Sequence, residues 1–95
     1  MNIKINQQQL NDICIENDIG FLGLFGSCAR ETQNPKSDID LLVNFKKTKS
    51  LLEKGDIITK FQALFKREVD LVSAKNLKPT IRPYVMKDLV TLYEE

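Results

Sequence analysis

The chain has 95 residues, and its 14 Lys and Arg residues nearly balance 13 Asp and Glu residues, giving a formal net charge of +1. This length predicts one small domain over residues 1–95. The charge balance provides no general field that would attract nucleic acid or an anionic membrane, so neither is an expected partner. The sequence contains no histidine, which excludes imidazole bases and histidine-bound zinc. Catalysis must therefore use carboxylates, lysines, hydroxyl groups or metal-bound water.

The two cysteines and the lengths of the apolar runs indicate the cellular compartment in which the protein is expected. Cys14 and Cys28 do not form a CxxC spacing, so reduced thiols are expected rather than a disulfide. No apolar run approaches the roughly 18 residues of a membrane-spanning helix, and the N-terminus lacks the apolar core of a signal peptide. We expect a soluble cytoplasmic protein.

The first half of the chain predicts one helix and two strands. Apolar positions three and four residues apart predict an amphipathic helix over residues 6–17. The segment 20–26, "GFLGLFG", is typical of a short buried strand between glycines. A polar loop, or a loop with one helical turn, is expected at 29–37. The segment 38–45, "DIDLLVNF", predicts a strand buried on both faces.

The second half predicts a longer helix and further short elements. Residues 50–65 predict a helix with one apolar stripe formed by Ile57, Phe61, Leu64 and Phe65. A strand is expected at 68–73, then a short helix within 77–87 whose start is delayed by two prolines, and a possible last strand in 89–95. This order predicts an α/β (α+β) domain with a small mixed central sheet covered by helices.

Three acids lie in the two predicted strands of the middle of the chain. Asp38 and Asp40 project to the same side of a strand because alternate side chains share a face. Asp70 can join them if its strand lies alongside. Such a cluster repels itself when empty, and oxygen ligands without histidine or thiolate suit magnesium or manganese.

A glycine and a serine, Gly26 and Ser27, end the strand that precedes these acids. A glycine there lets an anion approach backbone N–H groups, and the serine adds a hydroxyl donor, so the turn suits a phosphate. Taken singly, Gly-Ser, Asp-x-Asp and a lone strand Asp are each more often structural than functional. Together they indicate phosphoryl or nucleotidyl transfer assisted by two metal ions.

The combined motif resembles that of the minimal nucleotidyltransferase (MNT) domains of the DNA polymerase beta-like nucleotidyltransferase superfamily. The family pattern is Gly-Ser-x-Ala-Arg-Gly, a short loop, and Ser-Asp-x-Asp-Leu. In this chain it is matched by Gly26, Ser27, Cys28, Ala29, Arg30, Glu31, Ser37, Asp38, Ile39, Asp40 and Leu41. The likeness continues through "VDLVS" and "IRPYVMKDLVTLYEE", so the resemblance implies a polymerase beta palm-like fold for nearly the whole chain.

The resemblance also implies roles for the acids. Asp38 and Asp40 correspond to residues that bind both magnesium ions. Asp70 corresponds to the residue that binds the catalytic metal and helps to deprotonate the acceptor hydroxyl, with pyrophosphate as the leaving group.

The same resemblance implies a nucleotide site. Gly26 and Ser27 match positions that hold the β- and γ-phosphates of a nucleoside triphosphate, with ATP the expected substrate, and Arg30 and Ser37 are further nucleotide-binding candidates of the motif. Glu31 replaces the usual glycine after Ala-Arg and brings a negative charge towards the triphosphate.

MNT proteins are commonly paired with a helical HEPN protein in toxin–antitoxin modules. The resemblance implies an antitoxin that transfers AMP to a tyrosine of a HEPN toxin. The alternative is a catalytically weak binding module that neutralises the partner by contact. Glu31, in place of the usual glycine, would then indicate a relaxed requirement for catalysis. Transfer to an antibiotic or to RNA is disfavoured because the chain has no added acceptor domain and no strongly basic surface.

Overall fold

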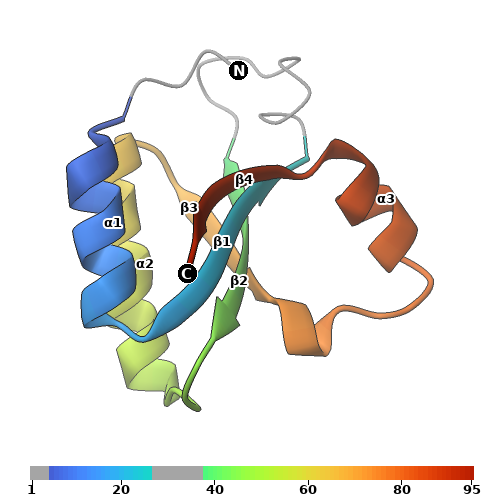
Figure 1. Cartoon of the computed structure of the whole chain (residues 1–95), viewed down its shortest axis with the longest axis horizontal. Helices are drawn as coiled ribbons and strands as arrows, with labels where there is room; N and C mark the ends of the chain where they lie inside the picture. The colour runs from blue at the N-terminus through green and yellow to red at the C-terminus, as the bar shows by residue number, and fades with distance from the viewer. Residues whose placement is uncertain (1–4, 27–37) are drawn as a thin grey trace.

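A computed structural model describes residues 5–26 and 38–95 of the chain (Figure 1). In chain order its elements are α1 (Gln7–Glu16), β1 (Ile19–Phe25), β2 (Ile39–Phe45), α2 (Leu51–Phe65), β3 (Val69–Ser73), the single 3-10 turn η1 (Ala74–Asn76), α3 (Arg82–Asp88) and β4 (Val90–Glu94). The predicted order of helices and strands is confirmed. The additional turn η1 was not predicted, because three residues are too few to produce a periodic pattern.

The four strands form one mixed sheet in the order β3-β2-β1-β4. Strand β2 is parallel to β3 and antiparallel to β1, and β1 is antiparallel to β4. The parallel pair follows from the crossover through α2, since parallel neighbours need a long connection. This arrangement confirms the predicted mixed central sheet.

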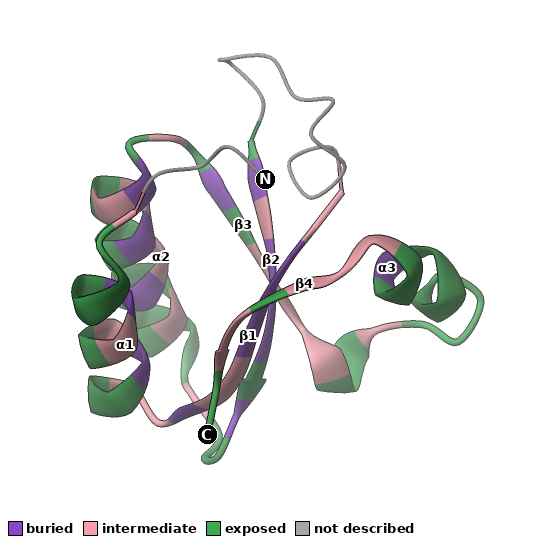
Figure 2. Cartoon of the chain, turned by 45° about the horizontal axis from the view of Figure 1, so that its top comes forward, coloured by how far each residue is buried: buried purple, intermediate pink, exposed green. Residues whose placement is uncertain are grey.

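Helices α1 and α2 lie together on one face of the sheet, whereas α3 lies on its other side (Figure 1). Alternate residues of β2 face the helix pair, and they join a buried cluster that includes Leu10 of α1 and Phe61 of α2. In Figure 2 the buried residues follow the strands and the inner sides of α1 and α2, while α3 is largely exposed. The main core therefore lies between the sheet and the helix pair.

Part of the opposite face of the sheet is covered by α3 and the residue that follows it. Leu42 of β2 is only 1% exposed although it points away from the main core, and Val85 of α3 is 6% exposed. A side chain added at Gly23 would collide with Leu89, just beyond α3. The chain after α3 thus packs directly onto the strand backbone, and the prediction that β2 is buried on both faces holds for Leu42.

Local signals fix the helix ends. The side chain of Asn6 accepts a hydrogen bond from the Gln9 N–H at the start of α1, and Ser50 and Glu53 form a reciprocal capping box at the start of α2. Pro83 lies at the start of α3, where its missing N–H costs nothing, which explains the late start of this helix. In the described segments no helix has the length and apolar character needed to cross a bilayer.

Candidate active site

The three predicted acids lie at the same end of the adjacent strands β2 and β3. Asp38 immediately precedes β2, Asp40 is the second residue of β2, and Asp70 is the second residue of β3. The parallel register pairs Asp40 directly with Asp70, so their side chains share a face of the sheet. Asp38, two residues before Asp40, belongs to the same face. This face is the one opposite α1 and α2.

Gly26 immediately follows β1 and lies beside these acids. Its φ of +75° lies in the region that favours glycine, and a Cβ atom there would overlap the Oδ2 atom of Asp40. The preceding residue, Phe25, is the cross-strand partner of Asp40. Nothing in the sequence singles out Phe25, because the pattern predicts a strand there but not its register. Gly26 therefore leaves room for the Asp40 carboxylate as well as forming the turn.

The acids interact electrostatically. Burial raises the pKa of Asp40 above its ordinary value, and the negative charges of Asp70 and Asp38 raise it further. Asp40 is half-buried, while Asp38 and Asp70 are exposed. Repulsion of this kind is what a divalent cation relieves, and a donor set made only of carboxylates suits magnesium.

The positions of the acids in the structure do not by themselves form a metal cage. Among residues 5–26 and 38–95, no three Asp, Glu or Cys side chains are placed so that together they could hold one ion. The strand register makes Asp40 and Asp70 neighbours, the acids repel one another, and their roles as metal ligands remain a prediction.

Several residues of the predicted motif lie outside the described residues. These are the loop predicted at 29–37 and the individual positions Ser27, Cys28, Arg30, Glu31 and Ser37. Cys14 is described: it carries a free thiol in the core, and burial raises its pKa to about 12. That thiol is a packing group rather than a nucleophile.

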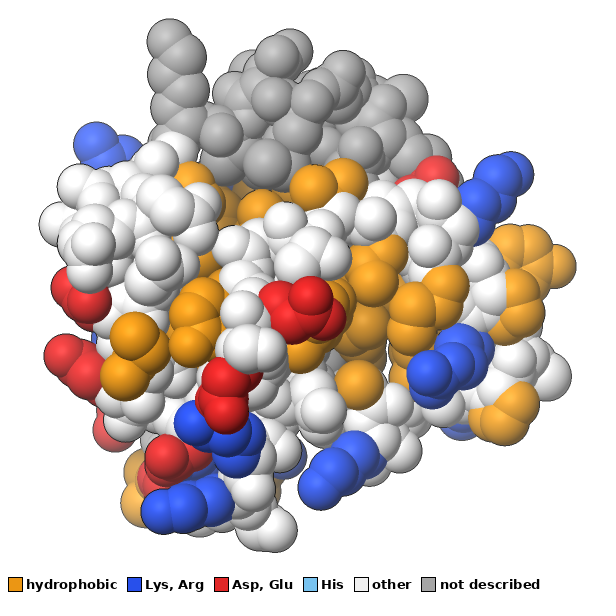
Figure 3. Space-filling model, viewed as in Figure 1, with side chains coloured by type: hydrophobic (Ala, Val, Ile, Leu, Met, Phe, Trp, Pro, Cys, Tyr) orange, Lys and Arg blue, Asp and Glu red, His pale blue; other side chains and the backbone are white. Residues whose placement is uncertain are grey.

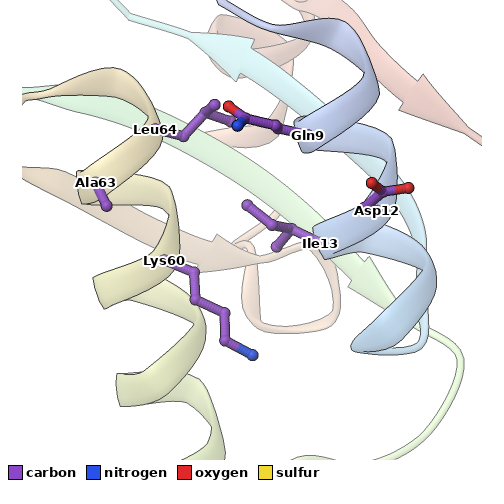
Figure 4. Close-up of a pocket in the computed structure, with 6 residues that line it drawn as sticks. All are labelled: Gln9, Asp12, Ile13, Lys60, Ala63 and Leu64. Carbon is purple, nitrogen blue, oxygen red and sulfur yellow. The ribbon is translucent and has the colours of Figure 1, made fainter.

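A groove of about 440 Å³ lies elsewhere, between α1 and α2. Figure 4 shows its lining, which consists of Gln9, Asp12, Ile13, Lys60, Ala63 and Leu64. One carboxylate and one ammonium on exposed helical side chains do not form a set of groups for transfer chemistry. We therefore place the candidate active site at the acids and Gly26.

A mixed sheet with carboxylates at the adjoining ends of two strands, next to a glycine turn, defines a nucleotidyltransferase-type domain. The sequence profile of the family described as polymerase beta nucleotidyltransferase matches residues 8–95. The chain belongs to this family, and its class of activity is nucleotidyl transfer.

One relative and two solved structures illustrate the similarity. Protein adenylyltransferase MntA of Thermococcus cleftensis is 36% identical over 73% of this chain and 70% of its own. A structure described as a toxin-antitoxin with AMP-PNP superimposes with a TM-score of 0.78 at 22% identity, covering 96% of this chain and 75% of that one. A structure of tri-AMPylated Shewanella oneidensis HEPN toxin in complex with MNT antitoxin gives a TM-score of 0.68 at 19% identity, covering 94% and 70%. At these identities the two structures establish the fold.

Proposed function

We propose that this chain transfers AMP from ATP to a tyrosine hydroxyl of a helical HEPN-type toxin and thereby acts as its antitoxin. The observation that carries the proposal is the register that pairs Asp40 with Asp70, beside a glycine whose missing side chain makes room for Asp40. The name of the Thermococcus relative, a protein adenylyltransferase, supports AMP as the transferred group. The HEPN toxin with MNT antitoxin supports the kind of partner.

The acids would hold magnesium, which supplies positive charge to neutralise the triphosphate and the departing pyrophosphate. Asp38 and Asp40 would hold the ions at the start of β2, and Asp70 would complete the set from β3. Asp70 is exposed, so an acceptor hydroxyl can reach it and give up its proton there. The roles of Ser27, Arg30 and Ser37 at the nucleotide belong to the same proposal.

The backbone at Gly26 contributes to the nucleotide site. The missing side chain at this position makes room for the Asp40 carboxylate, and a glycine also lets a phosphate come close to backbone N–H groups. We propose that the β- and γ-phosphates lie against this turn.

The acceptor hydroxyl comes from the partner. A hydroxyl held in line with the α-phosphorus has a large proximity advantage over one arriving from solution. Apolar side chains gather on the side of the molecule that carries α3 (Figure 3), including Ile81, 47% exposed, and Tyr84, 75% exposed. This apolar surface lies on the same side of the sheet as the acids and provides a contact area for a protein partner.

A growth assay separates transfer from simple binding. A HEPN-type toxin is expressed with the wild type, with an Asp38→Asn, Asp40→Asn double variant, or with the control Asp56→Asn. The control makes the same chemical change at an exposed position of α2. We expect the wild type and the control to restore growth and the double variant to fail while remaining folded. Full rescue by the double variant would favour the binding module.

A further inference from the structure

A small basic cavity lies at the end of the sheet opposite the acids. Its volume is about 180 Å³, and it lies where the end of β2, the start of α2 and the end of β3 meet. Its polar lining is formed by Lys47, Lys49, Lys54, Lys75, Thr48, Ser73 and Asn76. Among the described residues, no acidic side chain lines it. In Figure 3, Lys and Arg side chains appear at this lower end of the molecule.

The cavity is separate from the candidate active site. The acids lie at the start of β2 and β3, whereas the cavity is lined by Phe45 and Ser73 at the ends of these strands. At about 3.3 Å per residue, some 16 Å separate Asp40 from Phe45 and about 10 Å separate Asp70 from Ser73. A group bound in this cavity therefore does not take part in the chemistry at Asp40 and Asp70.

The charges of the four lysines are unequally compensated. The ammonium group of Lys49 lies 2.9 Å from Asp18 and 3.7 Å from Glu53, and its side chain is only 9% exposed. Lys54 and Lys75 form no ion pair with any residue in the described part of the chain. The charge of Lys49 is therefore compensated, and this residue forms part of the cavity lining. Lys54 and Lys75 leave uncompensated positive charge at the cavity.

We propose that this cavity binds a phosphate group. Several ammonium groups and two hydroxyls around one hollow match the charge and the acceptor oxygens of a phosphate. A cavity of about 180 Å³ is smaller than the ~300–1,000 Å³ of pockets that enclose a drug-sized ligand. The site therefore takes phosphate or pyrophosphate, or the terminal phosphate of a larger molecule that extends into solvent. This proposal is independent of the proposed AMP transfer.

The test is an NMR titration that follows backbone amides with phosphate and pyrophosphate at constant ionic strength. Chelator is present throughout, so that divalent ions cannot draw polyphosphate to the acids. We expect saturable shifts at residues 46–50 and 73–76, and little change at residues 38–40. A Lys54→Gln, Lys75→Gln double variant should bind about tenfold more weakly, since it loses two charge contacts. Lys60→Gln, an exposed change farther along α2, should bind as the wild type does.

The source of the phosphate is resolved by comparing pyrophosphate with a trinucleotide that does or does not carry a 5′-phosphate. Stronger binding of pyrophosphate indicates a free anion, and a requirement for the 5′-phosphate indicates a terminal group; both support the site. Three results would overturn it: shifts spread over exposed lysines including Lys60, equal binding of the unphosphorylated trinucleotide, or unchanged affinity in the folded double variant. Melting temperatures establish that the variants are folded.

Discussion

Replacing Gly26 by alanine should damage both the fold and the site. The φ of +75° at Gly26 disfavours any residue with a Cβ atom, at a cost of about 1–2 kcal/mol. The new Cβ would also overlap Asp40 Oδ2, and turning that carboxylate off its rotamer costs a further ~0.5–1.5 kcal/mol. Loss of glycine's freedom in the unfolded chain offsets about 0.4–1 kcal/mol. The net loss is roughly 2 kcal/mol, or a fall in Tm of about 10 °C for a domain of this size.

Chemical denaturation and thermal melting measure this loss, with Gly55→Ala as the control. Gly55 lies within α2 and a Cβ atom there meets nothing within 4 Å, so alanine should stabilise the protein by about 1 kcal/mol. The two Gly→Ala changes are therefore expected to have opposite signs. Equal effects would refute the reasoning from φ and overlap.

A double-mutant cycle isolates the overlap with Asp40. In an Asp40→Ala background the carboxylate is absent, so Gly26→Ala should retain only its backbone cost, about 1 kcal/mol. If Gly26→Ala costs the same in both backgrounds, the carboxylate does not limit the size of residue 26. Nucleotide affinity, measured in parallel with magnesium, should fall for Gly26→Ala and remain unchanged for Gly55→Ala.

Three further predictions concern charge and capping. Burial and the charges of Asp70 and Asp38 raise the pKa of Asp40, so the ionised form of Asp40 destabilises the fold. In chelator at pH 7, Asp40→Asn should therefore raise Tm by the equivalent of about 1 kcal/mol or less after solvent screening. Melting curves at different pH values should show this gain vanishing below pH 3.8, the ordinary pKa of the group. The hydrogen bond from Lys49 lowers the pKa of Asp18, and asparagine tolerates the positive φ of 57° at this position. Asp18→Asn should therefore lower Tm at pH values above the ordinary pKa of Asp18, and the Tm difference from the wild type should fade as pH falls through the folded-state pKa. A Tm difference that stays unchanged in acid would contradict the ion pair. Ser50→Ala should cost about 1 kcal/mol in urea denaturation through loss of the α2 cap, and no loss would show that the first turn of α2 does not depend on it.

The elements could be predicted from local patterns because each has a clear signal. The consecutive β2 residues Leu41, Leu42 and Val43 are buried, as its apolar run predicts. The stripe through Ile57 and Phe61 forms the buried side of α2. Pro83 delays α3 as expected. By contrast, η1 has no periodicity to detect, and the apolar spacing cannot show that α3 lies on the opposite face from α1 and α2.

The candidate site was predictable in part. Asp38 and Asp40 share a face because of strand alternation alone, but the pairing of Asp40 with Asp70 depends on register, which is a tertiary property. The overlap between Gly26 and Asp40 depends on the approach of two strands. The basic cavity joins residues from β2, α2 and β3, and no sequence pattern links positions so far apart along the chain.

The most direct test of AMP transfer at the acids is the intact mass of the helical partner after incubation with this chain, magnesium and each of the four nucleoside triphosphates. With ATP we expect the partner to gain one or more AMP groups on tyrosine, and to gain none with the Asp38→Asn, Asp40→Asn double variant. Asp56→Asn should transfer as the wild type does. A partner that stays unmodified with all four nucleotides, yet remains in a tight complex, would contradict transfer at this site.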